Sequence, residues 1–262
     1  IAGRGGDIAL RIYRPVGGKP GPVLVYYHGG GFMFGSLDAF DPSLRRLAAQ
    51  AGVTVVSVSY RLAPEAPYPA AWNDAEDAYS WARANLKDLG GTSVSVGGDS
   101  AGATLAIAVA LRAKAAHQPL PASLLLYYPG VDLVNDYPSL HAFGTGYGLD
   151  ADNLKYLADQ VYPAGVAISP EDTSPMQANL CGLPSALVVT AGFDPLKDGQ
   201  KAFAQKLIAA NPKTQVQSWP NLIHGFLQTT GYVPAALDAA DKSAVVFGDM
   251  ARHPAAGRKT CP

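Results

Sequence analysis

The stretch Ser95-Val-Gly-Gly-Asp-Ser-Ala-Gly-Ala-Thr-Leu-Ala106 places Ser100 between glycines, where a run with β-branched residues gives way to an alanine-rich run. The first run favours a strand and the second favours a helix, so the serine lies at a predicted strand-to-helix turn. Gly98-Asp-Ser-Ala-Gly102 fits the GxSxG pattern of a nucleophile elbow, which needs that strand and that helix around it. The glycines let neighbouring chain and a substrate approach a strained turn. The alternative is a glycine-rich turn whose serine only caps the helix.

Strand-like and helix-like segments alternate along the chain on both sides of this turn. The expected strands cover residues 8–13, 23–28, 53–59, 93–96, 123–128, 186–190 and 214–219. The expected helices cover residues 41–51, 73–85, 101–117, 152–162, 198–210 and 234–250. Asp41-Pro42 is expected to cap and start the first helix, and Gly52 to end it. This alternation predicts an α/β fold with a mostly parallel sheet and helices on both faces.

The length fits one domain with one insertion. A chain of 262 residues can bury its own core, so we expect a single α/β domain over residues 1–262. The segment 130–176 breaks the alternation and is rich in Gly, Pro, Asp and Tyr. A loop of this length in a compact fold is usually functional or forms a small subdomain. We therefore expect residues 130–176 to form a cap or lid over the carboxyl edge of the sheet.

Composition and charge exclude several classes of function. The net charge of −1 and the pI near 6.6 give no field that would attract nucleic acid. The two cysteines, Cys181 and Cys261, suggest neither a disulfide framework nor a metal site with paired thiols, which is compatible with a reducing compartment. The chain shows no membrane-spanning apolar run and no signal-peptide pattern at its start. We expect a cytoplasmic protein, either a monomer or a homo-oligomer.

A second run of glycines follows the strand at residues 23–28. In Tyr27-His-Gly-Gly-Gly-Phe32 the glycines leave backbone N–H groups unobstructed, so these groups can face a negatively charged oxygen. We expect Gly30 and Gly31 to form an oxyanion hole together with the N–H of Ala101, the residue after the serine. The alternative is a phosphate-binding loop, but neither GxGxxG nor GK[ST] spacing is present.

An acyl-transfer serine also needs a base and a group that orients the base. Of the histidines at positions 28, 117, 141, 224 and 253, only His224 lies in a short turn after the last strand, at the edge where catalytic groups gather in open α/β sheets. His28 is expected to fix the glycine loop by hydrogen bonding. Asp194 follows the strand 186–190, whereas Asp198 is expected to cap the next helix. The order Ser100, Asp194, His224 is that of α/β-hydrolases.

The chain resembles the bacterial hormone-sensitive lipase-like esterases, also called family IV, within the α/β-hydrolase fold. The motifs that carry the resemblance span nearly the whole chain in family order: HGGGF at 28–32, YRLAPE at 60–65, GDSAG at 98–102, YP at 128–129, DPL at 194–196 and HGF at 224–226. The resemblance implies a serine carboxylesterase that acts on short- to medium-chain esters through an acyl-enzyme, with no cofactor and no metal. It further implies these roles: Ser100 as nucleophile, His224 as general base and acid, Asp194 as orienting carboxylate, and Gly30, Gly31 and Ala101 as oxyanion donors.

The chain departs from the family pattern in three places. Ala103 replaces the usual second glycine after GDSAG, and Gly199 replaces the acidic residue that often follows DPLRD, which here reads DPLKD at 194–198. The N-terminal cap region of the family has no counterpart before Ile1 in this sequence, which predicts a more open pocket. Arg61 and Glu65, in the YRLAPE motif, resemble structural or site-shaping residues of the family rather than chemical ones.

The substrate pockets and the reaction are less constrained than the reacting groups. Pocket residues are expected among Phe34, Asp99, Leu196, Ile223 and the insertion around Tyr147, although these side chains could equally be ordinary core. The same reacting groups could serve an amidase, a peptidase or a lipase, because they do not specify the leaving group. A non-catalytic receptor on the same fold is a further alternative, since fold does not fix function.

Overall fold

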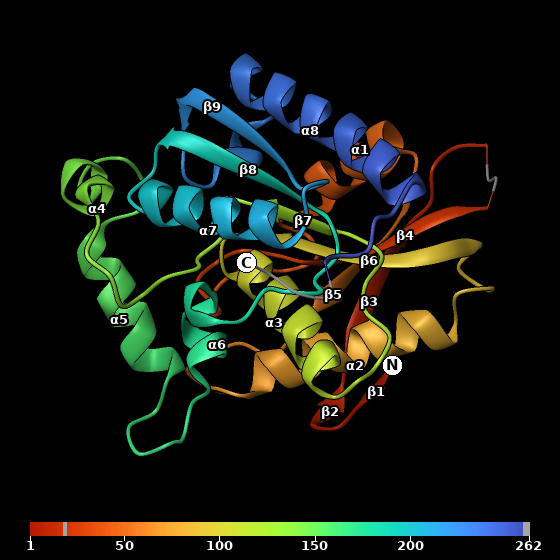
Figure 1. Ribbon diagram of the computed structural model, residues 1–262, viewed down its shortest axis with the longest axis horizontal. Coiled ribbons are helices and arrows are strands. Elements are labelled where there is room, and N and C mark those ends of the chain that lie inside the picture. The colour runs from red at the N-terminus through yellow and green to blue at the C-terminus, as the bar shows by residue number, and fades with distance from the viewer. Residues whose placement is uncertain (18–19, 259–262) are drawn as a thin grey trace.

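A seven-stranded, mostly parallel sheet runs through the centre of the computed structural model, which describes residues 1–17 and 20–258 (Figure 1). The strand order is β3-β5-β4-β6-β7-β8-β9, and β3 alone in this sheet is antiparallel to its neighbour. The strands are β3 (Ala9–Tyr13), β4 (Gly21–Tyr27), β5 (Thr54–Ser59), β6 (Gly91–Asp99), β7 (Leu124–Tyr127), β8 (Ala186–Phe193) and β9 (Gln215–Ile223). The α/β fold expected from the sequence is confirmed.

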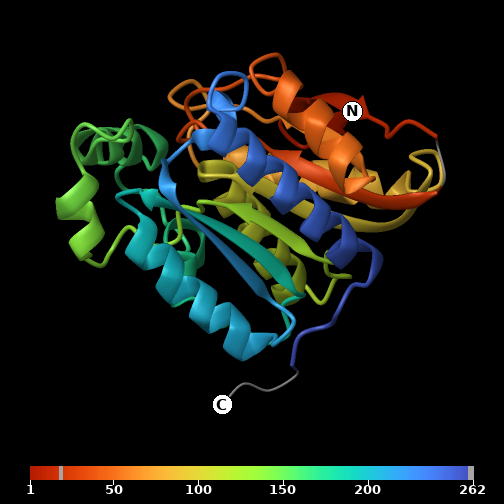
Figure 2. The same cartoon turned by 90° about the horizontal axis from the view of Figure 1, so that it is seen from above.

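Helices cover both faces of the sheet. Helices α1 (Asp41–Ala51) and α8 (Pro234–Arg252) lie side by side on one face (Figure 2). Helices α2 (Ala70–Ala84), α3 (Ala101–Ala115) and α7 (Lys197–Ala210) pack on the other face. Helix α3 is buried along most of its length, which explains its alanine-rich sequence, because small side chains allow close packing on all sides.

The segment 130–176 forms a group of short helices at one end of the sheet. These helices are α4 (Pro138–Phe143), α5 (Ala151–Val161), α6 (Pro170–Thr173) and η1 (Pro175–Gln177). Figure 1 shows α4 and α5 in green on the left, beyond the carboxyl ends of β8 and β9. The sequence predicted only α5 here, because the other helices are too short to give a readable period. A 3₁₀ turn, η2 (Phe226–Thr229), follows β9.

Several expected boundaries and caps differ in the structure. The hairpin of β1 (Ala2–Gly3) and β2 (Gly6–Asp7) was not predicted, because two-residue strands carry no alternation. Asp41 was expected to cap helix α1, but it is the first residue of the helix. The cap position is occupied by Phe40, whose side chain makes no capping hydrogen bond. Gly52 ends this helix in the left-handed conformation (φ 63°), as expected.

The cysteine expectation needs a correction. Cys181 is disulfide-bonded in the structure, and no disulfide was expected from the spacing of the cysteines. Cys261 lies outside the described residues.

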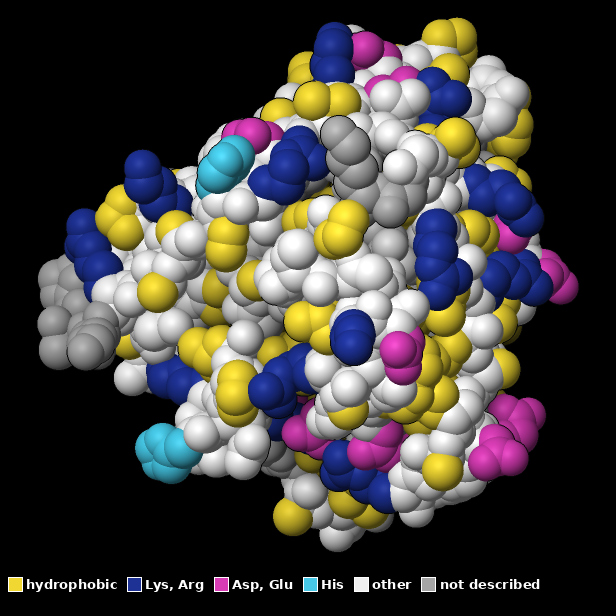
Figure 3. All heavy atoms as spheres, turned by 90° about the vertical axis from the view of Figure 1, so that its right-hand side faces the viewer, with side chains coloured by type: hydrophobic (Ala, Val, Ile, Leu, Met, Phe, Trp, Pro, Cys, Tyr) yellow, Lys and Arg dark blue, Asp and Glu magenta, His cyan; other side chains and the backbone are white. Residues whose placement is uncertain are grey.

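The surface carries charges of both signs. Figure 3 shows basic and acidic side chains interspersed with apolar ones on the face at the right of Figure 1. This mixture agrees with the small net charge and gives this face no basic patch suited to a polyanion.

Candidate active site

Four strands of the sheet, β4, β6, β8 and β9, end in the residues that the sequence singled out. Ser100 follows β6, the glycine loop follows β4, Asp194 follows β8 and His224 follows β9. Parallel strands bring their carboxyl ends to one edge of a sheet, so residues far apart in sequence meet there. The structure thus brings the predicted serine, histidine and aspartate together.

These three side chains form one chain of hydrogen bonds. The Nδ1 atom of His224 lies 2.8 Å from Oδ2 of Asp194, and its Nε2 atom lies 2.9 Å from Oγ of Ser100. Because a carboxylate only accepts hydrogen bonds, the neutral imidazole carries its proton on Nδ1 and leaves Nε2 free to accept from the hydroxyl. The arrangement can therefore take a proton from the serine as the hydroxyl attacks an acyl carbon.

The carboxylate of Asp194 is held from three sides. The side chain is fully buried (0% exposed), and besides the imidazole it accepts from the backbone N–H of Leu196 at 2.8 Å and from Nε2 of Gln200 at 2.9 Å. Gln200 was not identified from the sequence. The only available signal is that a glutamine occupies the buried face of α7, three residues before the buried Phe203.

The turn at Ser100 has the geometry that the glycines imply. Its φ of 52° and ψ of −121° lie in a region that side chains rarely adopt. A Cβ atom on Gly98 or Gly102 would collide with the carbonyl oxygen of Tyr27 on the neighbouring strand. The glycines are therefore required for close approach of the turn to β4, as the sequence predicted.

The glycine loop also needs its glycines. Gly30 (φ 118°) and Gly31 (φ 62°) both have positive φ, and a Cβ atom on Gly30 would collide with the carbonyl of Phe34. Within residues 1–17 and 20–258, no protein acceptor is found for the backbone N–H groups of Gly30, Gly31 or Ala101. Unpaired N–H groups beside a nucleophile are the donors that an oxyanion hole requires.

Asp99, expected among the pocket residues, also supports the glycine loop. It borders the outer cavity, but it is buried and its oxygens bond to protein. Its Oδ1 accepts from the N–H of Gly29 and the hydroxyl of Tyr26, both at 2.9 Å, and its Oδ2 accepts from Tyr128 at 3.4 Å. Burial raises the pKa of Asp99 to about 6. Asp99 therefore supports the glycine loop from beneath.

His28 fixes the same loop from the other side. Its Nδ1–H donates to the carbonyl of Gly29 at 2.8 Å, and its carbonyl accepts from the hydroxyl of Tyr60 at 2.7 Å. Burial lowers the pKa of His28, so the ring remains neutral. This is the role that the sequence assigned to it.

The expected role of Asp198 as the cap of α7 is wrong. Helix α7 begins at Lys197 with Leu196 at its cap position, so Asp198 is already inside the first turn. Its Oδ2 instead accepts from the backbone N–H of Ser139 at 2.9 Å, near the start of α4. Asp198 thus joins two helices rather than capping its own.

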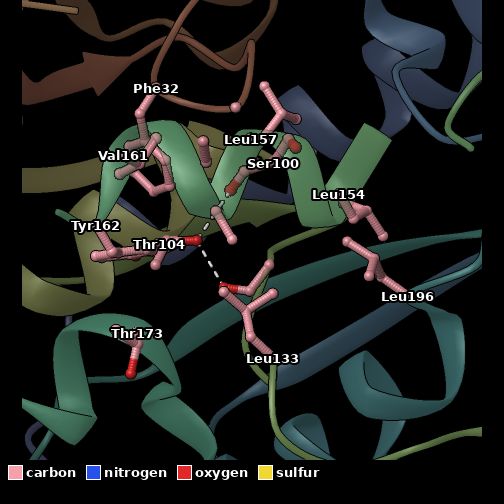
Figure 4. Close-up of a pocket in the computed structure, with 14 residues that line it drawn as sticks. Phe32, Ser100, Thr104, Leu133, Leu154, Leu157, Val161, Tyr162, Thr173 and Leu196 are labelled. Carbon is pink, nitrogen blue, oxygen red and sulfur yellow. Dashed lines mark hydrogen bonds between the residues drawn. The ribbon is translucent and has the colours of Figure 1, made fainter. Parts of the chain in front are cut away.

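Two cavities meet at Ser100. The inner cavity, about 70 Å³, is lined by apolar side chains that include Leu133, Leu157 and Leu196 (Figure 4). In this view the hydroxyl of Thr104 donates to the carbonyl of Gly130 at 2.6 Å. The outer cavity, about 600 Å³, contains His224.

The expected pocket residues divide between these cavities. Phe34 (61% exposed) and Ile223 (37% exposed) line the outer cavity, and Leu196 lines the inner one. The ring of Tyr147 stacks on Phe193 instead, with ring centroids 5.5 Å apart. Among the described residues, no group of three or more His, Cys, Asp or Glu is placed to hold a metal ion.

A family model described as α/β hydrolase fold matches residues 24–228, most of the chain. The chain belongs to this family. The resemblance to hormone-sensitive lipase-like esterases is confirmed by this match and by the curated relatives.

Curated relatives of the chain are ester hydrolases. The chain is 40% identical over 240 residues to the carboxylic ester hydrolase LipN of Mycobacterium tuberculosis, covering 87% of this chain and 63% of LipN. It is 38% identical over 245 residues to the carboxylesterase NlhH of the same species, covering 90% of this chain and 76% of NlhH. The chain therefore spans less than two thirds of LipN and about three quarters of NlhH.

Solved structures of esterases superpose closely. The ester hydrolase EH1AB1 from the metagenome of Lake Arreo gives a TM-score of 0.91 at 38% identity, over 95% of this chain and 81% of that one. A hyperthermophilic esterase from the archaeon Pyrobaculum calidifontis gives a TM-score of 0.90 at 38% identity. The match covers 96% of this chain and 84% of that one.

Proposed function

We propose that the protein is a serine carboxylesterase that hydrolyses short- to medium-chain carboxylic esters through an acyl-enzyme on Ser100. The observation that carries the proposal is the hydrogen-bonded chain from Asp194 through His224 to Ser100, which ends where two cavities meet. The family and the names of the relatives support ester hydrolysis as the reaction.

The reaction follows from the positions of these groups. His224 accepts the proton of Ser100 as Oγ attacks the ester carbon, and the imidazolium bonded to Asp194 then donates that proton to the departing alcohol. Water next attacks the acyl-enzyme with His224 again as base, which releases the acid. The N–H groups of Gly30, Gly31 and Ala101 stabilise the oxyanion of both steps, by about 3 kcal/mol for each donor.

The position of His224 supports an assignment of the acyl and alcohol sides of the ester to the two cavities. Its Nε2 must reach the leaving oxygen, so the alcohol lies in the outer cavity that contains His224, and the acyl group lies in the inner cavity. The inner cavity is about 70 Å³ and the outer one about 600 Å³. We therefore expect a small acyl group and a bulky alcohol.

A pair of isomeric esters tests this assignment. 2-Naphthylmethyl acetate and methyl 2-naphthylacetate have the same atoms and similar leaving groups, but the ring lies on opposite sides of the ester. The acetate should show the higher kcat/KM. Preference for methyl 2-naphthylacetate would reverse the assignment, whereas no hydrolysis of either ester or of ethyl acetate would refute the esterase proposal.

An amidase or peptidase, a lipase and a receptor are the alternatives. A panel of p-nitrophenyl esters of increasing acyl length, with matching anilides and emulsified triglycerides, separates the three enzyme classes. Binding without turnover by the wild-type protein would indicate a receptor. The complete hydrogen-bonded triad geometry favours an enzyme over a receptor.

The cytoplasmic location expected from the sequence belongs to this proposal. No helix in the described part of the chain is both long and apolar enough to cross a bilayer. The disulfide at Cys181 is the observation against a reducing compartment, where such bonds are rare. Fractionation of cells that express the natural protein tests the location, and gel filtration distinguishes a monomer from a homo-oligomer.

A further inference from the structure

A third cavity, about 310 Å³, adjoins the inner cavity and takes no part in the mechanism above. We call it the distal cavity. It lies between the α4–α5 segment and the start of α7, and it shares four lining residues with the inner cavity: Leu133, Leu154, Ala158 and Leu196. Figure 4 shows Leu154 and Leu196 side by side at one end of the inner cavity. The side chains that close the acyl pocket therefore also form a wall of the distal cavity.

The walls of the distal cavity suit an alkyl chain. Its two charged side chains are already bonded within the protein: Lys155 donates from Nζ to Asp159 at 2.7 Å. Asp132 accepts from Nδ2 of Asn135 at 2.6 Å, from the hydroxyl of Tyr137 at 2.8 Å and from Oγ of Ser174 at 3.0 Å. These bonds occupy the carboxylate within the protein. Much of the remaining lining is apolar and includes Leu140 and Pro195. An alkyl group loses no hydrogen bond on entering such a space and gains burial.

Gly199 leaves this space open. A Cβ atom at this position would lie 3.1 Å from the ring of Tyr137 and 3.7 Å from Cβ of Asp132, both of which line the distal cavity. A longer side chain at position 199 would therefore extend among the lining residues and occupy part of the volume.

Hydrogen bonds hold the two sides of the distal cavity together. Oγ of Ser139 in α4 donates to the carbonyl of Pro195 at 2.9 Å and accepts from the N–H of Asp198 at 3.1 Å. The N–H of Ser139 donates to Oδ2 of Asp198 at 2.9 Å. These reciprocal bonds fix α4 against the start of α7, so the cavity is a defined part of the fold.

We propose that the distal cavity is a second compartment of the acyl site, which takes the terminal methylenes of medium-chain acyl groups. Chains that outgrow the 70 Å³ inner cavity pass between Leu154 and Leu196 to reach it. The inference rests on the proposed esterase function and on the placement of the acyl group in the inner cavity. It extends the substrate range from short to medium-chain acyl groups.

The test fills the distal cavity without touching Ser100. In Gly199→Leu the added side chain occupies the compartment, so the kcat/KM ratio of p-nitrophenyl octanoate to p-nitrophenyl acetate should fall. Each buried methylene contributes about fourfold, so exclusion of two methylenes lowers the ratio about 15-fold. Lys201→Leu adds the same side chain on the exposed side of α7 and should leave the ratio unchanged.

Two further variants protect the test against a folding defect. Leu140→Trp fills the distal cavity from the α4 side and should lower the same ratio, whereas Leu154→Ala widens the passage and should raise it. An unchanged ratio in folded Gly199→Leu and Leu140→Trp, with acetate still hydrolysed, would refute the distal compartment and leave the esterase proposal intact. Loss of acetate hydrolysis in the wild-type protein would instead refute the proposed function.

Discussion

Asp194 lies just before α7 and Asp198 lies in its first turn, but the two carboxylates bond to different partners. Asp194 bonds to His224, and Asp198 bonds to Ser139. We expect Asp194→Asn to lower kcat by about 10⁴-fold with little change in stability, because an amide favours the wrong histidine tautomer.

Asp198→Asn is the matched control, since its amide oxygen can still accept from Ser139, and it should keep most of the activity. Steady-state kinetics on both folded variants, with circular dichroism, checks this pair. A nearly inactive Asp198→Asn beside a nearly normal Asp194→Asn would show that the acid is misassigned.

The buried carboxyl of Asp99 gives a pH-dependent stability. Its pKa rises to about 6 because it is buried, so the folded state favours the protonated form. The stabilisation is complete below the pKa of the unfolded chain, near 4, and is lost as pH rises through about 6. Relative to Asp99→Asn, which does not titrate, the free energy of unfolding of the wild type should fall by about 2 kcal/mol from pH 4 to pH 7. Urea unfolding at several pH values measures this difference, and a constant difference would contradict it.

At the scale of elements, aromatic rings fasten the α4–α5 segment to the end of β8. Phe193 of β8 stacks on Tyr147 and packs edge-on against Phe143 of α4, with centroids 5.5 and 5.7 Å apart. Phe193→Ala should speed limited proteolysis within residues 143–150 several-fold, while Tm changes little because Phe193 is partly exposed. Ile208→Ala, which truncates a similarly exposed apolar side chain of α7, is the control and should leave the cleavage rate unchanged. Equal cleavage rates in both variants would contradict this fastening role.

At the scale of the whole molecule, cavity sizes predict the acyl preference. The proposed acyl site consists of the inner and distal cavities, about 70 and 310 Å³, and we expect it to take short and medium chains rather than the long acyl chains of common triglycerides. Short-chain p-nitrophenyl esters should therefore turn over faster than emulsified long-chain triglycerides, as measured by pH-stat titration. Faster hydrolysis of the emulsion would contradict the proposed substrate range.

Local signals made much of this molecule predictable. The β-branched runs predicted the strands, and the alanine-rich run predicted α3. The glycines at 98 and 102 predicted the turn at Ser100. Each of these features depends on neighbours in sequence. Gln200 and the Ser139–Asp198 bonds were not predicted, because their partners come from other segments. The bonds of Asp99 were not predicted for the same reason, since only tertiary structure shows that Tyr26 and Gly29 bond to its carboxylate.

The central claim is that Ser100 is the nucleophile. Diethyl p-nitrophenyl phosphate transfers one diethylphosphoryl group to an activated serine and releases p-nitrophenolate, so mass spectrometry of the digested protein identifies the attacking residue. We predict one modification for each chain, on the peptide that contains Ser100, with loss of esterase activity in proportion and no modification in Ser100→Ala. Stoichiometric modification of another residue, or undiminished esterase activity in folded, contaminant-free Ser100→Ala, would contradict the account.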